Sequence, residues 1–239
     1  MRIAIIGVPG LGAERIRDLF CKKWNMYNYI KFPELEEDKG ELESQELLEK
    51  SIISFAEKNL QKMKEYTKFE DMVLYETIPL EWLLMAIREN EADAFSDDSV
   101  RELFKLSNES LKYLDCVFMI PKSKFNEIED KNIDKDVISD IGQLYDNIIH
   151  SYNYGDKCPF FNLLDCPGFI EIFGTDEQKM QMFSFYLKDD GGLIDDNMQQ
   201  LLSPEQLAEG QEILQAEIKN QKEAQKKEAF YKQLKNYKH

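Results

Sequence analysis

Residues 2–20 read RIAIIGVPGLGAERIRDLF, and the order of residue types in this segment indicates the fold. The apolar run from Ile3 to Ile6 is typical of a buried strand. Three glycines follow it, and we expect a helix to begin at about Ala13. Glycines allow the backbone N–H groups of such a loop to point inward and bind a phosphate group. The stretch therefore predicts a strand, a phosphate-binding loop and a helix in succession.

The loop departs from the usual phosphate-binding form, GxxxxGK[ST], at its last two positions. The glycine frame is present, but a methyl group and a carboxylate occupy the positions of the lysine and the hydroxyl residue. Because an ion pair at ~4 Å is worth roughly 4 kcal/mol at an effective dielectric of 20, this exchange should weaken nucleotide binding strongly. Arg15, Lys135 or a residue from another subunit could replace the lysine. We expect a vestigial nucleotide site made of Gly7, Gly10, Gly12, Ala13, Glu14 and, as argued below, Glu76.

Strand and helix signals alternate along most of the chain, which predicts an α/β fold with a parallel five-stranded sheet flanked by helices. The further strands are expected at residues 26–32, 72–75, 116–120 and 169–174. The helices between them are expected at about 44–66, 80–88, 96–114 and 138–152, and a last one follows a capping box at Thr175. In such a sheet the carboxyl ends of the strands share one edge, where ligands bind.

The character of the sequence changes at Ser203. We interpret residues 1–196 as the α/β domain and residues 203–239 as a polar helical arm, rich in Gln, Glu, Lys and Ala. A helix this polar is not stable alone. It is either a frayed, solvated tail or an arm that docks on a partner chain. In the second case its anchors are Phe230, Tyr231, Leu234 and Tyr237.

Composition excludes several classes of function. The formal net charge is -16, which opposes general nucleic-acid binding because phosphate backbones are anionic. The cysteines and histidines lack metal-site spacing, so we expect no metal. The N-terminus has no signal peptide, and no apolar run reaches the ~18 residues of a membrane span. We therefore expect a protein that is neither secreted nor membrane-bound.

Several stretches resemble a group of P-loop ATPases and kinases carried by bacteriophages, related to nicotinamide-riboside kinases and deoxynucleoside kinases. Together these stretches cover most of residues 1–196, in order: Arg2 to Gly12, Trp24 to Tyr27, Val73 to Glu76, Leu111 to Pro121, Asp165 to Gly174 and Tyr186 to Gly191.

The resemblance implies an acidic residue after the third strand, acting as a base or ordering magnesium, and usually followed by arginine. Glu76 matches the acid, but Thr77 follows it. The resemblance also implies a lid helix with arginines, and residues 134–152 contain none. Together with the altered loop, three phosphate-handling features are absent, which opposes phosphoryl transfer.

Three functions remain open. We favour a non-catalytic P-loop-fold protein, without catalytic residues or a cofactor. It would serve as a structural or assembly component of a bacteriophage virion or phage complex, and its arm would bind itself or other phage proteins in the host cytoplasm or the virion. The alternative is an active ATPase or a nucleotide or nucleoside kinase with a rearranged phosphate site. The third is a regulatory module that binds a nucleotide or metabolite without turnover.

Overall fold

The computed structural model describes residues 1–32, 45–66, 71–123, 125–126, 130, 132–154 and 167–194. Its centre is a five-stranded sheet with the strand order β2-β3-β1-β4-β5. All four neighbouring pairs are parallel. The predicted α/β class and five-stranded parallel sheet are therefore confirmed. The strands are β1 (Arg2–Gly7), β2 (Asn28–Ile30), β3 (Val73–Tyr75), β4 (Cys116–Ile120) and β5 (Gly168–Glu171).

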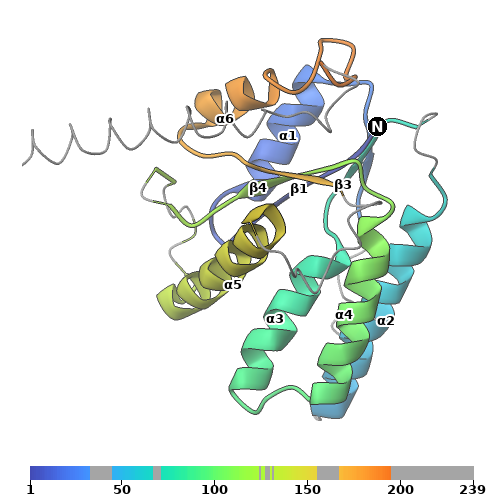
Figure 1. Cartoon of the computed structure of the whole chain (residues 1–239), viewed down its shortest axis with the longest axis vertical. Helices are drawn as coiled ribbons and strands as arrows, with labels where there is room; N and C mark the ends of the chain where they lie inside the picture. Colours follow the sequence, from blue (N-terminus) through green and yellow to red (C-terminus); the bar gives the residue numbers. More distant parts are fainter. Residues whose placement is uncertain are drawn as a thin grey trace, which may run out of the picture. The chain divides into compact units, whose positions relative to one another are not determined.

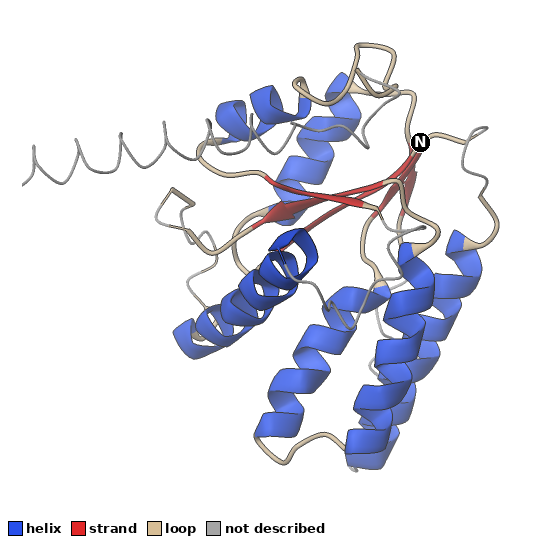
Figure 2. Ribbon diagram, in the orientation of Figure 1, coloured by secondary structure: helices blue, strands red, loops and turns tan. Residues whose placement is uncertain are grey.

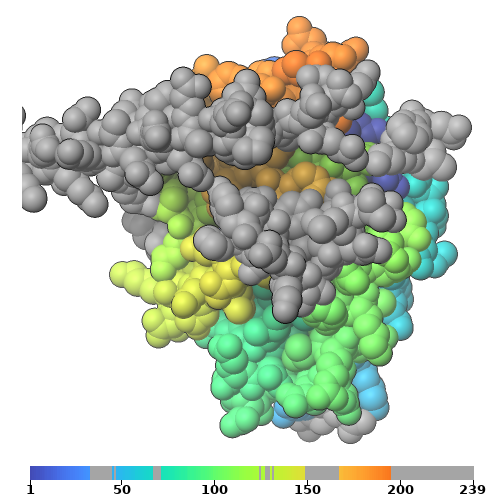
Figure 3. All heavy atoms as spheres, in the orientation of Figure 1, coloured from blue at the N-terminus to red at the C-terminus, as the bar shows by residue number. Residues whose placement is uncertain are grey.

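Helices cover both faces of the sheet, giving three layers (Figures 1 and 2). Two helices lie on one face, α1 (Ala13–Lys23) and α6 (Asp176–Phe183). The other face carries α2 (Gln45–Met63), α3 (Pro79–Glu91), α4 (Asp97–Leu111) and α5 (Lys135–Tyr154). The space-filling view shows α5, in yellow, packed beside α3, in green (Figure 3).

Burial explains why these segments form the sheet. Every residue of β4 is buried, and β1 is buried up to its last residue, as expected of central strands with helices on both faces. An aromatic cluster joins β4 to the helices above it. The ring of Phe183 lies 4.6 Å from Phe118 and 5.1 Å from Phe20, in edge-to-face geometry that adds to the stability gained by burial.

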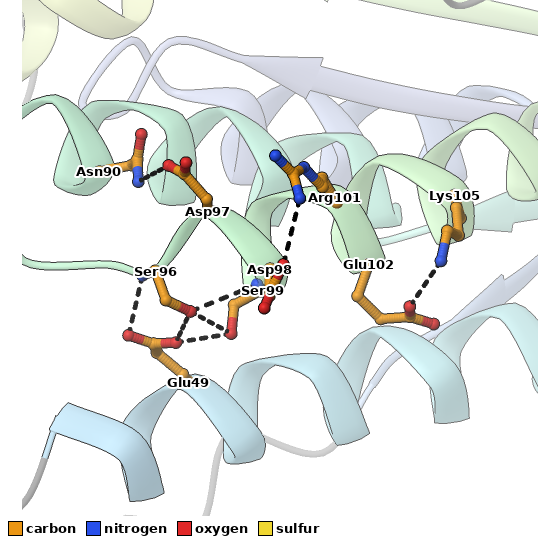
Figure 4. A network of polar contacts seen from close by, with 9 residues as sticks. All are labelled: Glu49, Asn90, Ser96, Asp97, Asp98, Ser99, Arg101, Glu102 and Lys105. Carbon is orange, nitrogen blue, oxygen red and sulfur yellow. Dashed lines mark hydrogen bonds and ion pairs between the residues drawn. The ribbon is translucent and has the colours of Figure 1, made fainter.

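A polar joint connects α2 to the beginning of α4 (Figure 4). The Glu49 side chain accepts hydrogen bonds from Ser96 N, at 3.0 Å, and from the hydroxyl groups of Ser96 and Ser99. Gln45 Nε2 also donates to it, at 3.2 Å. Ser96 is the N-cap of α4 and accepts from Ser99 N. The joint therefore fixes the start of α4 against α2, and all of its polar groups have partners.

Two strands are shorter than the sequence predicts by at least two residues, and β3 is shorter by one. The strand expected at residues 26–32 is limited to Asn28–Ile30, because Phe32 N donates to the Glu76 side chain beyond the end of β3. The strand expected at residues 169–174 ends at Glu171. Gly174, with a φ of +94°, turns the chain into the predicted capping box of Thr175.

The expected arm at residues 203–239, with its anchors Phe230, Tyr231, Leu234 and Tyr237, lies outside the described residues. Its docking role remains a prediction. In the part of the chain that is described, no helix has both the length and the apolar character needed to cross a bilayer.

Candidate functional site

The glycine loop, residues 7–13, joins β1 to α1 and keeps the backbone form that its sequence predicts. Gly10 and Gly12 have φ values of +81° and +76°, in the left-handed region that favours glycine. The loop is held by hydrogen bonds from Val8 N to Ile120 O and from Leu11 N to Val8 O, each 3.2 Å long. The altered residues at its end therefore stand on an intact backbone.

The loop opens into a cavity of about 540 Å³ at the carboxyl edge of the sheet. Its lining includes all the loop residues proposed from the sequence, with further residues of α1, α3 and the segment before α5: Gly7, Gly10, Gly12, Ala13, Glu14, Arg15, Arg17, Asp18, Glu81, Asp130 and Ile133. Glu76 is not part of this lining. The structure thus brings together five of the six predicted site residues.

Backbone donors remain available in this cavity. Within the described residues, the N–H groups of Gly10, Gly12 and Ala13 have no hydrogen-bond acceptor. They stand at the N-terminus of α1, where the helix dipole favours an anion. The lysine position itself carries only the methyl group of Ala13, which lies close to the backbone of Gly7. The loop therefore keeps backbone donors at a helix N-terminus and lacks the lysine and hydroxyl side chains of the usual motif.

The two cations that the sequence suggested as replacements for the lysine are placed differently. Arg15 is a half-exposed side chain that forms an ion pair with Asp176 of α6, with Nη2 2.7 Å from Oδ1. This contact directs Arg15 toward α6. Lys135, at the start of α5, is exposed and is not among the residues that line the cavity.

Arg17 is the cation that the sequence interpretation passed over. Its Nη1 donates to the carbonyl oxygen of Ile5, at 2.8 Å, and its charge acts on the hydroxyl of Tyr29, on Glu81 and on Tyr145. The sequence did carry a signal for it. Arg17 follows Ala13 by four residues, and side chains at i and i+4 share one face of a helix.

Glu81 was also missed. It stands in the first turn of α3, where Oε2 accepts from Thr77 Oγ1 at 2.7 Å and from Ile78 N at 3.2 Å. Burial raises the pKa of this carboxyl group, and the Arg17 charge and the two donors oppose that effect only in part. Thr-x-x-x-Glu before an apolar helix was the available signal, since an acid in the first helical turn caps the backbone.

Glu76 ties two strand ends together. Its Oε1 accepts from the Tyr29 hydroxyl at 3.3 Å, and its Oε2 accepts from Phe32 N at 3.0 Å. Burial raises the pKa of Tyr29 to about 12, so this phenol stays protonated at neutral pH and remains a donor. Glu76 is thus connected to Arg17 through the hydroxyl of Tyr29, and it does not line the cavity.

Three aromatic side chains form a cluster that begins at Phe32, whose backbone N–H donates to Glu76, and continues through Phe55 to Trp82. The rings of Phe55 and Trp82 are 5.1 Å apart, and those of Phe32 and Phe55 are 6.5 Å apart. Two buried polar atoms near them, Trp82 Nε1 and Asn59 Oδ1, have no hydrogen-bond partner in the described part of the chain. Unpartnered buried polar atoms are rare in folded proteins and call for an explanation.

Comparison with solved structures supports a single fold. A deoxyadenosine kinase from M. mycoides with its products dCMP and dCDP matches with a TM-score of 0.55 and 16% identity, over 77% of this chain and 97% of that chain. The same kinase with dATP matches with a TM-score of 0.51 and 18% identity, over 77% and 98%. A thymidylate kinase from Candida albicans gives a TM-score of 0.49 at 14% identity, over 82% and 95%.

No protein-family model matches the sequence, and the search of curated proteins gives no match. At 16–18% identity, the structural matches show the fold alone. This chain therefore has the P-loop nucleotide kinase fold, with its glycine loop between β1 and α1 at the carboxyl edge of a five-stranded parallel sheet.

Proposed function

We propose that this chain binds a nucleotide at the carboxyl edge of its sheet, with the phosphate groups against the glycine loop. The observation that carries the proposal is the cavity of about 540 Å³ in front of an intact loop. Ligand pockets commonly measure about 300–1,000 Å³, so this one can hold a nucleotide's phosphates and part of its sugar.

The local electrostatics at the glycine loop favour binding of an anion, although the net charge of the whole chain is negative. Free N–H groups and the positive end of α1 converge on the loop. The carboxylates of Glu14, Asp18, Glu81 and Asp130 also line the cavity, and they oppose binding unless a cation intervenes. We therefore expect weaker binding than a loop lysine would give, and a dependence on divalent cations.

The aromatic group beside Glu76 supports a nucleoside as the rest of the ligand. Aromatic faces stack on any base, and Phe32, Phe55 and Trp82 are each only partly buried. Beside these rings, Trp82 Nε1 and Asn59 Oδ1 are buried atoms without a partner in the described part of the chain.

Phosphoryl transfer is a second candidate, because one carboxylate in the cavity suits it. Glu81 has a raised pKa, and a carboxyl group tuned toward neutrality can accept a proton from a substrate hydroxyl. Magnesium would bring charge neutralisation, and Glu14 and Asp18 are oxygen donors of the kind it prefers. Without the lysine and hydroxyl positions, we expect any transfer to be slow.

Thermal stabilisation by a panel of nucleotides tests the proposal, with ATP, dATP, dCTP and dTMP each measured with and without Mg²⁺. At least one of them should raise the melting temperature in proportion to the logarithm of its concentration. Chromatography of ATP with Mg²⁺ and a nucleoside or nucleoside monophosphate acceptor measures ADP and phosphorylated acceptor, and so separates the two candidates.

A matched pair of variants locates the binding site. Ala13→Asp adds a carboxylate to the loop, at a helix start that tolerates it. Ala92→Asp makes the same change at an exposed position after the end of α3. The first should abolish the stabilisation and the second should leave it intact. Equal stabilisation of both variants, or none of the wild type, would contradict the proposal.

A further inference from the structure

The cavity contains two arginines, and their surroundings differ. Arg15 is half exposed and is ion-paired to Asp176. Among the described residues, no carboxylate oxygen lies within ion-pairing distance of the Arg17 guanidinium, which contacts the carbonyl of Ile5 through Nη1 and the hydroxyl of Tyr29. Both partners are neutral, so in the described part of the cavity the charge of Arg17 is not paired with a carboxylate.

The position of Arg17 lets its side chain reach the glycine loop. It follows Ala13 by four residues, or about 6 Å of helix rise. Side chains on a helix lean toward its N-terminus, so the guanidinium is carried back along α1 toward the loop. Ile5, which accepts its hydrogen bond, stands two residues before Gly7 and one residue past the last β1–β3 pair. The positive charge therefore sits at the carboxyl end of β1.

The guanidinium also has hydrogen-bonding capacity to spare. Arginine has five N–H donors, and Arg17 Nε is buried without a partner in the described part of the chain. A side chain that lines a cavity, carries a permanent charge and leaves a buried donor unused is suited to an oxyanion. Guanidinium groups bind phosphate oxygens through paired, charge-assisted hydrogen bonds.

We propose that Arg17 replaces the missing loop lysine and supplies the cation that binds the ligand's phosphate oxygens. This inference depends on the proposed function, because it assigns a residue to the phosphate half of that site. It places the cation one helical turn beyond the loop, beside Glu81 and the end of β1. The loop can then keep Ala13 at the lysine position, because the positive charge is supplied by Arg17 from the next turn of α1.

Calorimetric titration with inorganic tripolyphosphate and with ATP tests the assignment, because the first probe has no base. Arg17→Gln removes the charge and keeps a shorter amide side chain, and Arg101→Gln makes the same change at an exposed position on α4 that does not line the cavity. The loss of a charged hydrogen-bonding group is expected to lower the affinity of both probes about 10- to 100-fold for Arg17→Gln. Arg101→Gln should change it by less than about threefold.

A rescue variant distinguishes replacement of the lysine from a general structural effect. Ala13→Lys in the Arg17→Gln background puts a cation back at the loop and should recover at least about tenfold of the lost affinity. Failure of this rescue, equal losses in the two glutamine variants, or full affinity in Arg17→Gln would each overturn the inference. If the wild type binds neither ATP nor any other nucleotide, the proposed function fails first.

A measurement on the wild type covers the case in which Arg17→Gln does not fold. The arginines of the chain are Arg2, Arg15, Arg17, Arg88 and Arg101, so the Nε–H signals of ¹⁵N-arginine-labelled protein can be assigned individually. Tripolyphosphate should shift the Arg17 signal most and slow its hydrogen exchange. A shift confined to Arg15, or no shift at Arg17 when the ligand is bound, would also overturn the inference.

Discussion

Arg2 and Arg17 lie at opposite edges of the same sheet, and they show two uses of a buried guanidinium. At the amino edge, Arg2 Nη2 lies 3.1 Å from Asp115 Oδ1, with 6% and 8% of the two side chains exposed. Two further hydrogen bonds join the same residues: Arg2 N donates to the side-chain oxygen Asp115 Oδ2 at 2.7 Å, and Asp115 N donates to Arg2 O at 2.8 Å. At the carboxyl edge, Arg17 has a carbonyl partner and a cavity.

Whether a charged side chain has a direct partner of opposite charge, more than how deeply it is buried, separates a structural group from a candidate ligand-binding group. A closed pair such as Arg2–Asp115 leaves nothing for a ligand to bind, and its disruption is costly. An open guanidinium is available to an anion.

The largest effect is expected at the amino edge. Asp115→Ala should lower the free energy of unfolding by about 3–5 kcal/mol, because it leaves the Arg2 charge buried without its partner. Urea denaturation measures the loss. The double variant Arg2→Met with Asp115→Leu should recover most of it. A loss under about 1 kcal/mol for Asp115→Ala would show that the pair is not the structural element that its geometry indicates.

A smaller loss is expected at the joint between α2 and α4. Glu49→Ala leaves Ser96 N and the two hydroxyl groups without their acceptor, which should cost about 1–3 kcal/mol in urea denaturation. Nucleotide-induced stabilisation should be unchanged, since Glu49 does not line the cavity. If the variant lost nucleotide binding while keeping its stability, the division between satisfied and open charges would be wrong.

Glu49 and Glu81 should give opposite dependences of stability on pH. Burial acts to raise the pKa of Glu49, but the hydrogen bonds from Ser96 and Ser99 hold it below the ordinary value of 4.5. Its stabilisation is therefore complete above pH 4.5 and is lost as the pH falls through the folded-state pKa. Burial raises the pKa of Glu81 above 4.5. Between 4.5 and that pKa the folded state binds more protons, so stability falls as the pH rises.

Glu81→Gln should remove that fall above pH 4.5, and Glu49→Gln should remove the loss below it. Urea denaturation of both variants and the wild type over pH 3.5–7.5 measures the two slopes, a range that brackets the ordinary value of about 4.5. A Glu81→Gln curve parallel to that of the wild type above pH 4.5 would mean that this carboxyl group titrates normally.

The smallest effect is expected for the exposed pair at the other side of the cavity. Arg15→Gln breaks the ion pair with Asp176, in which the arginine side chain is 52% exposed, and should cost no more than about 1 kcal/mol. Denaturation in low and high salt checks this, because screening should remove the difference. A loss above about 2 kcal/mol would indicate that the pair holds α6 in place.

The sequence predicts the centre of this fold well because its signals there are local. β1 and β4 are continuous apolar runs, and the glycine loop and the capping box at Thr175 depend on residues that are close in the chain. The shortening of the strand at residues 26–32 could not be predicted in the same way. It depends on where β3 ends, more than 40 residues later in the chain.

The candidate site was predicted in its backbone and only in part in its side chains. The loop residues came directly from the motif, and they do line the cavity. Glu76 followed from position after a strand, but its contacts turn it toward Tyr29 and Phe32. Predicting the position of Arg17 would have required knowing that the β1–β3 pairing ends at Ala4, which leaves the carbonyl of Ile5 to accept from Arg17. No sequence pattern shows where a ladder stops.

The most direct test of nucleotide binding at the glycine loop is a calorimetric titration of the wild type with adenosine, AMP, ADP and ATP in the presence of Mg²⁺, repeated for the cytidine series. We expect the affinity to rise with each added phosphate in at least one series, because the loop N–H groups and Arg17 bind phosphate oxygens. Affinity that is the same for nucleoside and triphosphate, or no heat with any of them at millimolar concentration, would contradict it.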